Sequence, residues 1–259
     1  MFTEFKDKVL FVTGAASGMG RAVAVRFGSL GCKVAVAARR PDAAMETVKM
    51  VEEAGGQAIF VPCDVADEAS VKRAIDTTVS TFGTLDYAFN NAGCGADGVH
   101  IPFAPLTEVT EEDWLKVIST NLTGMFHCLK YELIQMGKQG GGAIVNTSSI
   151  GGLHMAPGFG AYGPSKAGVI AITQTAATEN AKNGIRVNVI CPGPTDGTNL
   201  MEDSKASGAQ DVEFLKQNVI PMGKLGTTDD VADAVVFLCS NMAGHITGCA
   251  LPVCGGMQM

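Results

Sequence analysis

The sequence predicts an α/β protein with a doubly wound parallel sheet covered by helices on both faces, a three-layer α/β/α architecture. Short apolar runs alternate with segments of helical composition along the whole chain. A glycine-rich turn joins the first apolar run to the first helix. The 259 residues, 46% of them hydrophobic, can bury one large core. Because no linker or repeat interrupts the pattern, we expect residues 1–259 to form a single domain.

Charge and composition exclude several classes of partner. A formal net charge of −7 and a pI near 5.1 argue against nucleic acid and anionic membranes. The N-terminus is too polar for a signal peptide and no apolar run reaches membrane-spanning length, so we expect a cytoplasmic protein. The eight cysteines form no Cys-x-x-Cys pair and the four histidines are scattered, which predicts reduced thiols and no metal site.

The first predicted strand, Val9 to Val12, leads into the turn Thr13-Gly-Ala-Ala-Ser-Gly-Met-Gly20. A helix from Arg21 to Leu30 follows, and Gly31 ends it. Glycines between a strand and a helix let the backbone approach a pyrophosphate, whose charge the helix N-terminus favours. The residues assigned to this contact are Gly14, Ser17, Gly18, Met19 and Gly20.

The second predicted strand, Lys33 to Ala37, bears on the choice of cofactor. An NAD-binding fold places a carboxylate about 20 residues beyond the glycines, and here that place holds Ala38, followed by Arg39. No carboxylate would repel a 2′-phosphate there, and a guanidinium is available to bind one. We therefore expect NADP(H) to be preferred, with NAD(H) as the alternative. In the competing interpretation, Arg39 and Arg40 are a solvated edge of the next helix.

The next elements bring a carboxylate to the same edge of the sheet. A helix is expected from Met45 to Ala54, and a third strand from Ala58 to Val61 leads to Asp64 and Val65. Asp64 could contact an adenine. Equally, it could cap the following helix, which we expect from Glu68 to Phe82.

The fourth predicted strand, Leu85 to Phe89, ends in Asn90-Asn-Ala-Gly93. Small and amide side chains at this place suit a wall against which a flat cofactor lies, although a polar turn would have the same composition. The residues assigned to the wall are Asn91, Ala92 and Gly93.

Thr110 and Asp113 have the spacing of a helix cap, which predicts a helix running through Trp114 to Met136 with Gly137 after it. Asn121 falls in the middle of this helix, where asparagine is disfavoured. A buried functional role and simple solvent exposure both account for it.

The fifth strand and the segment after it carry the candidate chemistry. The apolar run Ala143 to Val145 brings Ser149 to the end of a buried strand, before a glycine-rich loop. Pro164 is tolerated only in a first helical turn, so the next helix should begin near Gly160 or Ala161.

On that helix, Tyr162 and Lys166 are four residues apart and share one face. A phenol has a pKa near ~10, and lowering it to about 7 takes roughly 4 kcal/mol, which a neighbouring ammonium and a second positive charge could supply. Ser149 offers a hydroxyl that can hydrogen-bond a substrate oxygen as its charge changes. Taken singly, a chance Tyr–Lys spacing and ordinary turn chemistry explain the same residues.

The remaining chain completes the alternation. A strand from Ile185 to Ile190, an irregular polar segment over 196–219, a helix from Asp229 to Ser240 and a last strand from Ala250 to Val253 are expected. We interpret 196–219 as a mobile segment that covers the site. The helix after Tyr162 carries small residues that suit a subunit contact, namely Ala167, Ala171, Ala176, Ala177 and Ala181.

Together these motifs resemble, in order and over nearly the full length, the short-chain dehydrogenase/reductase family with its Rossmann-type sheet. The motifs are Thr13-Gly-x-x-x-Gly-x-Gly20, Asn90-Asn-Ala-Gly93, Asn121, Ser149, Tyr162-x-x-x-Lys166 and Pro192-Gly193. The resemblance implies that Tyr162 exchanges a proton with the substrate oxygen, which Ser149 positions. It also implies that Lys166 holds the nicotinamide ribose and lowers the Tyr162 pKa, while Asn121 supports a water that leads protons to Lys166.

Further cofactor contacts are assigned to Pro192, Gly193 and Thr195, and to Tyr162 and Lys166 themselves. Two positions depart from the family pattern. Gly197 stands where the family often has threonine, with Thr198 beside it, and Cys254 begins a Cys-Gly-Gly sequence where the family usually has Asp-Gly-Gly.

The expected activity is NADP(H)-dependent interconversion of a secondary alcohol and a ketone by hydride transfer, on a cyclic or steroid-like (hydroxysteroid) substrate. The alternatives are a 3-oxoacyl-[acyl-carrier-protein] reductase and, more distantly, a non-catalytic dinucleotide sensor. The family resemblance implies a homo-oligomer, a tetramer, with a small-molecule ketone or alcohol as the substrate.

Overall fold

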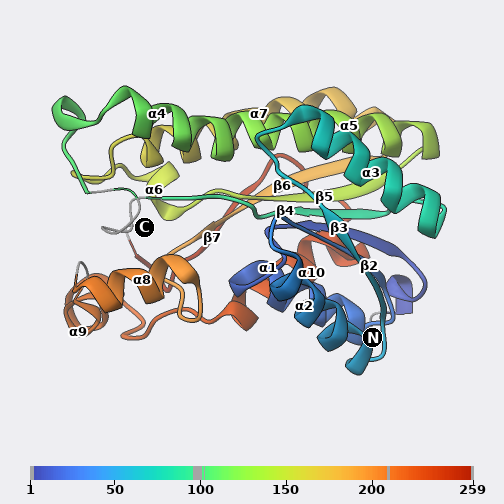
Figure 1. The fold of residues 1–259 in the computed structure, drawn as a ribbon, viewed down its shortest axis with the longest axis horizontal. Coiled ribbons are helices and arrows are strands. Elements are labelled where there is room, and N and C mark those ends of the chain that lie inside the picture. The colour runs from blue at the N-terminus through green and yellow to red at the C-terminus, as the bar shows by residue number, and fades with distance from the viewer. Residues whose placement is uncertain (1–2, 96–100, 102, 209–210, 258–259) are drawn as a thin grey trace.

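The computed structural model describes residues 3–95, 101, 103–208 and 211–257, and its centre is a seven-stranded parallel sheet (Figure 1). The strand order is β3-β2-β1-β4-β5-β6-β7. The strands are β1 Val9–Thr13, β2 Lys33–Ala38, β3 Gln57–Pro62, β4 Tyr87–Asn90, β5 Gly142–Thr147, β6 Ile185–Pro192 and β7 Ala250–Val253. Because the order reverses between β1 and β4, a crevice is expected where these two strands end.

Helices cover both faces of the sheet, as predicted (Figure 1). One face carries α1 Gly18–Ser29, α2 Pro41–Glu53 and α10 Thr228–Cys239, and the other carries α3 Glu68–Phe82, α5 Gly124–Gln139 and α7 Tyr162–Asn180. Strand β1 shows why its sequence is a continuous apolar run. Leu10 and Val12 pack into the core on the α1 side, whereas Phe11 packs into the core on the α5 side.

The helix predicted from Trp114 to Met136 is confirmed in its course, but it contains a π-helical turn and ends later than predicted. The structure has α4 Glu111–Ile118, a π-helical turn Ser119–Thr123 and then α5. The helix does not stop at Gly137 but at Gly140, which adopts a left-handed φ of 83° and donates its N–H to the Met136 carbonyl. A glycine inside a helix and a glycine that ends one look alike in sequence.

Other boundaries differ by a few residues. Helix α2 begins at Pro41 rather than Met45, because proline suits a first helical position. A short helix, α6 Ile150–Leu153, was not predicted. The segment 196–219 contains α8 Asn199–Ser207, α9 Val212–Phe214 and a second π-helical turn, Leu215–Val219. Its mobility stays a prediction.

Three further expectations concern what the described residues contain. No helix among them is both long and apolar enough to cross a membrane. No group of three or more His, Cys, Asp or Glu side chains within the described ranges is arranged to hold a metal ion, and all eight cysteines are free thiols. The alanine stripe on α7 is partly wrong as a subunit contact, because Ala176 and Ala177 are buried in the chain's own core.

Candidate active site

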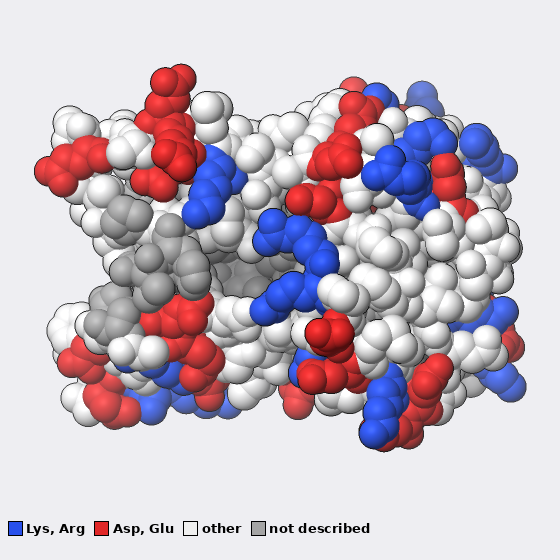
Figure 2. Space-filling view, viewed as in Figure 1, with Lys and Arg blue, Asp and Glu red and all other residues white. Residues whose placement is uncertain are grey.

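A cavity of about 950 Å³ lies at the carboxyl ends of the strands, between the segments that follow β1 and β4. Figure 2 shows this face hollowed at its centre, with cationic side chains beside the hollow. Arg39, Arg40 and Lys116 are among the residues that line it. The cavity brings together every sequence-predicted site residue except Gly20 and Asn121, which lie behind its wall.

The glycine-rich turn lies against the end of β4. A Cβ atom at Gly14 would lie 2.9 Å from Ala92 Cα, so only glycine lets the two segments meet. A Cβ at Gly20 would collide with the Gly14 carbonyl oxygen. Gly20 therefore packs α1 against the turn behind the cavity lining, and its contact with a cofactor stays a prediction.

The first turn of α1 points its N–H groups toward the cavity edge. Ser17 is the N-cap residue, yet its side chain makes no capping hydrogen bond. The turn is held from behind by α2, because Thr47 Oγ1 donates to Ala15 O at 2.9 Å and Arg21 Nη2 donates to Ala16 O at 2.6 Å. An uncapped helix N-terminus held rigidly in this way suits an anion such as a pyrophosphate. No signal in the sequence identified Thr47 or Arg21.

At the end of β2, Ala38 is buried and the Arg39 side chain is 73% exposed. Its guanidinium Nη1 lies 3.9 Å from Asp64 Oδ2. The capping alternative for Asp64 is wrong, since Asp67 caps α3 by accepting from Ala69 N at 2.9 Å. Asp64 and Arg39 thus sit together on the cavity edge.

Thr13 joins the ends of β1 and β4. Its Oγ1 accepts from Asn91 N at 3.0 Å and from Ala92 N at 3.2 Å. The Asn91 side chain donates to Gly14 O at 3.5 Å, while its buried Oδ1 has no hydrogen-bond partner among the described residues. The predicted wall is therefore fixed by Thr13, the first residue of the glycine-rich motif, which the sequence did not assign to the site.

Ser149, Tyr162 and Lys166 meet at the floor of the cavity. Ser149 is the N-cap of α6, where its Oγ accepts from Gly151 N at 3.0 Å, and it also hydrogen-bonds Tyr162. Helix α7 begins at Tyr162, so Tyr162 and Lys166 lie one turn apart. Lys166 Nζ donates to Thr147 O at 3.0 Å and lies 5.7 Å from the centre of the Tyr162 ring.

Burial shifts both titratable groups toward their neutral forms. It raises the pKa of Tyr162, which the hydrogen bond with Ser149 partly opposes, and it lowers the pKa of Lys166 to about 8. The raised pKa of Tyr162 comes from the loss of water around the phenol, so the role of Lys166 in lowering it stays a prediction that concerns the enzyme with its cofactor bound. A lowered phenol pKa needs a further positive charge or donor at the site.

Asn121 is buried, 1% exposed, so the solvent-exposure alternative is wrong. The π-helical turn carries it beneath the cavity, where Oδ1 accepts from Cys94 N at 2.8 Å. Its Nδ2 donates to Cys94 O at 2.7 Å and to Ser165 Oγ at 3.1 Å. Asn121 thereby ties the segment after Gly93 to the residue before Lys166.

Near the end of β6, the structure explains the departure at Gly197 and places Cys254, the other departure, against Gly193. A Cβ at Gly193 would lie 3.0 Å from Cα and Cβ of Cys254, so these residues pack together. Gly197 has a φ of 73°, a conformation that threonine would adopt only under strain, and Thr198 instead caps α8 by accepting from Met201 N at 3.3 Å. Thr195 Oγ1 donates to Gly193 O at 2.9 Å.

The segment 196–219 forms one side of the cavity. A Cβ at Gly18 would lie 3.5 Å from Thr198 Cα, and one at Gly95 would lie 3.5 Å from Leu200 Cδ1. The segment therefore touches both the glycine-rich turn and the surroundings of Tyr162. The apolar side chains that line the cavity were not predicted, and they include Ile101, Phe103, Phe159, Leu200, Phe214 and Leu215.

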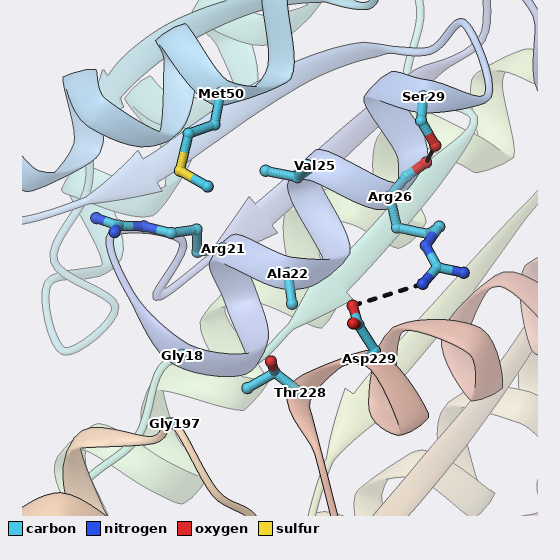
Figure 3. A pocket seen from close by; sticks show the side chains of 10 residues that line it. All are labelled: Gly18, Arg21, Ala22, Val25, Arg26, Ser29, Met50, Gly197, Thr228 and Asp229. Atoms are coloured by element: carbon cyan, nitrogen blue, oxygen red, sulfur yellow. Dashed lines mark hydrogen bonds and ion pairs between the residues drawn. The ribbon is translucent and has the colours of Figure 1, made fainter. Parts of the chain in front are cut away.

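A second hollow of about 540 Å³ lies along α1 and α10 (Figure 3). Its two arginines are engaged by the protein. Arg26 pairs with Asp229 at 3.5 Å and with Asp233, and Arg21 bonds backbone carbonyls and Glu46. It is therefore a structural groove whose arginines support the helices.

Comparison with known proteins agrees with this geometry. A family model described as enoyl-(acyl carrier protein) reductase matches residues 14–258. An uncharacterized oxidoreductase of Thermotoga maritima is 40% identical over 97% of this chain and 98% of its own. A 3-oxoacyl-[acyl-carrier-protein] reductase FabG of Staphylococcus epidermidis is 38% identical over 98% of this chain and 100% of its own.

Among solved structures, that of an NAD⁺-bound xylitol dehydrogenase superposes with a TM-score of 0.90 at 34% identity, covering 98% of this chain and 100% of the other. Fold, motifs and relatives agree over nearly the whole length. The chain therefore belongs to the short-chain dehydrogenase/reductase family and is an NAD(P)-dependent oxidoreductase acting on CH–OH groups.

Proposed function

We propose that this protein is an NADP(H)-dependent oxidoreductase that interconverts a secondary alcohol and a ketone of a cyclic or steroid-like substrate. The observation that carries the proposal is the meeting of Ser149, Tyr162 and Lys166 on the floor of a cavity that apolar side chains also line. Residues 1–259 would act as one catalytic domain.

The residues present fit a nicotinamide dinucleotide. The uncapped first turn of α1 would hold the pyrophosphate, and Asp64 and Val65 would face the adenine. Two buried acceptors on the cavity wall, Asn91 Oδ1 and Thr147 Oγ1, lack partners among the described residues and could receive hydroxyl or amide donors. Gly93 and Gly193 would let the flat ring lie against the backbone.

The protein groups would divide the chemistry as follows. The bound nicotinamide supplies the hydride acceptor or donor and, when oxidised, a positive charge. Tyr162 would take the hydroxyl proton as an alcohol is oxidised and return it as a ketone is reduced. Ser149 would donate a hydrogen bond to the substrate oxygen, and Lys166 would hold the ribose while supporting charge on Tyr162. Asn121 would orient this floor through Cys94 and Ser165.

The preference for NADP(H) rests on the end of β2. Ala38 offers no carboxylate to a ribose 2′-hydroxyl, and the exposed Arg39 guanidinium makes a long contact of 3.9 Å with Asp64. A 2′-phosphate would receive stronger, charge-assisted hydrogen bonds from the same guanidinium.

A cyclic or steroid-like substrate suits the apolar side chains of the cavity lining. Phe103, Phe159 and Phe214 could cover a flat hydrocarbon surface, and His154 is a polar group on the same lining. A second candidate, reduction of a carrier-bound 3-oxoacyl thioester, is favoured by the FabG relative. Against it, Asp203 and Asp211 also line the cavity, and the phosphodiester of a carrier arm would meet like charge near them.

Assembly and location are part of the same proposal. Exposed apolar side chains on α4 and α5, namely Leu115, Phe126 and Ile134, support a homo-oligomer, for which we propose a tetramer. Eight unpaired thiols support a reducing cytoplasmic location.

The test is the initial rate of NADPH and NADH consumption by the purified protein with cyclic diketones, oxo-steroids and a 3-oxoacyl thioester. Turnover of a cyclic or steroidal ketone with NADPH would support the proposal. Turnover of the thioester alone would favour the second candidate. Cofactor binding with no turnover on any ketone would contradict both and point to a dinucleotide sensor.

A further inference from the structure

A buried carboxyl group lies behind the cavity wall and takes no part in the chemistry described above. Glu132, on α5, is 0% exposed. Its Oε2 accepts from Asn90 Nδ2 at 2.8 Å, and Asn90 is the last residue of β4. An ionised carboxylate in a protein core is costly unless a cation or hydrogen bonds compensate its charge.

Glu132 is one end of a polar network through the core. Asn90 Nδ2 also donates to Asn146 Oδ1 at 3.1 Å, and Asn146 Nδ2 donates to Thr173 Oγ1 at 2.9 Å. All four side chains are 0 or 1% exposed. The network therefore links α5, β4, β5 and α7 with no water-exposed member.

The two atoms without partners complement each other. Within the described residues, Glu132 Oε1 and Asn90 Oδ1 have no hydrogen-bond partner. Both atoms only accept if the carboxyl is ionised, whereas a neutral carboxyl has one O–H to donate. One proton on Glu132 Oε1 would supply the donor that Asn90 Oδ1 lacks, so that acid and amide form two hydrogen bonds side by side.

We infer that Glu132 is a neutral carboxylic acid at neutral pH and a positioning residue, which holds the ends of β4 and β5 in register beneath the cofactor. Asn90 is followed directly by the wall residues Asn91 to Gly93. Asn146 is followed by Thr147, whose carbonyl accepts from Lys166 Nζ. The network is thus directly adjacent in the chain to residues of both halves of the site.

The surroundings of Glu132 favour the neutral form. Burial raises its pKa to about 8, although the hydrogen bond from Asn90 opposes the shift. The neighbouring thiols of Cys63 and Cys128 have raised pKa values and carry no charge. Lys166, on α7, donates to the Thr147 carbonyl and not to Glu132. On α3, the charged side chains are exposed and so point away from the core, namely Lys72, Arg73 and Asp76.

The protonation state can be measured without any assumption about activity. In protein labelled with ¹³C at the glutamate carboxyl carbon, the Glu132 signal is identified by its loss in Glu132→Gln. We expect this signal to titrate well above the ordinary glutamate value of about 4.3. A titration midpoint in the ordinary range would overturn the inference.

The positioning role rests on the proposed function and is tested by kinetics on the full-length protein. Glutamine can form the same two hydrogen bonds, so Glu132→Gln should keep kcat within about threefold of wild type, whereas Glu132→Leu should lower it at least about tenfold. Wild-type kcat should also fall above about pH 8 more steeply than that of the Gln variant.

Two kinetic results would overturn the role. If Gln loses as much activity as Leu, a charged carboxylate is needed, and if Leu keeps wild-type kcat, the network does not position the site. If Glu132→Leu does not fold, the kcat of Glu132→Gln and the ¹³C titration of Glu132 still test the inference. A wild-type protein with no turnover on any ketone would refute the proposed function and leave the titration result standing.

Discussion

Replacing Gly95 with alanine tests whether catalysis depends on the exact place of the Tyr162 ring. A Cβ at Gly95 would lie 2.8 Å from Cε2 and 2.9 Å from Cδ2 of that ring. The optimal van der Waals separation of two non-bonded carbon atoms is about 3.5–4.0 Å, so the ring must move by roughly 0.7 Å or more. A misplacement of ~1 Å can cost about 100-fold in rate, and we therefore expect kcat to fall by ~10- to 100-fold.

The matched control is on the opposite edge of the same ring. A Cβ at Gly151 would lie 3.8 Å from Cε1 and 4.0 Å from Cδ1 of Tyr162, which is ordinary contact. Gly151→Ala should therefore keep kcat within about twofold. Neither glycine has a left-handed φ, so alanine adds no backbone strain at either place.

The assay is stopped-flow NADPH oxidation under single-turnover conditions, with cofactor affinity measured separately by fluorescence titration. Because the added methyl group meets the phenol ring, Gly95→Ala should change the rate of the chemical step and leave cofactor affinity within about threefold. A Gly95→Ala variant with more than half of the wild-type rate would refute the reasoning. The same holds if both alanine variants lose activity equally.

Three further predictions concern single groups. Tyr162→Phe should lower turnover by about 10²- to 10⁴-fold with cofactor affinity nearly intact, and a variant that retains more than about a tenth of wild-type turnover would reject the proton-carrier role. Ala38→Asp combined with Arg39→Leu should shift preference toward NADH by about 10-fold or more, because a charge-assisted contact is worth ~1.5–3 kcal/mol; an unchanged ratio of the two specificity constants would contradict this. Between its unfolded pKa of about 4.3 and its folded pKa of about 8, Glu132 binds one more proton in the native state, so its contribution to the free energy of unfolding falls by ~1.4 kcal/mol per unit of rising pH. Urea unfolding at pH 5.5 and 7.5 measures this fall in the free energy of unfolding, which should be ~2–3 kcal/mol smaller in Glu132→Gln than in wild type. An equal fall in both proteins would argue that Glu132 is ionised in the folded state.

The fold was predictable because its signals are local. Strand β1 reads as an apolar run, since both faces of a covered parallel sheet are buried. The turn after it needs glycine, because Gly14 lies against Ala92. Helix ends were less predictable: Gly137 and Gly140 are equally plausible stops, and only the backbone conformation separates them.

The sequence predicted which residues form the candidate site better than it predicted their pKa values. Ser149, Tyr162 and Lys166 meet as their spacing suggested, yet burial moves the pKa of Tyr162 and Lys166 toward the neutral forms. Thr47 and Arg21, which hold the glycine-rich turn, come from a face of α1 and α2 that carries no motif.

Sequence alone determined the α/β alternation, the family and the residues of the floor and the wall, because periodicity and motif spacing are properties of neighbouring positions. The tertiary structure decided what depends on distant segments meeting. Asn121 is buried because a π-helical turn directs it toward Cys94, and Gly197 is glycine because its φ is positive. No residue near Glu132 in the sequence indicates its hydrogen-bond partner. Only the packing of α5 against β4 brings Glu132 to Asn90.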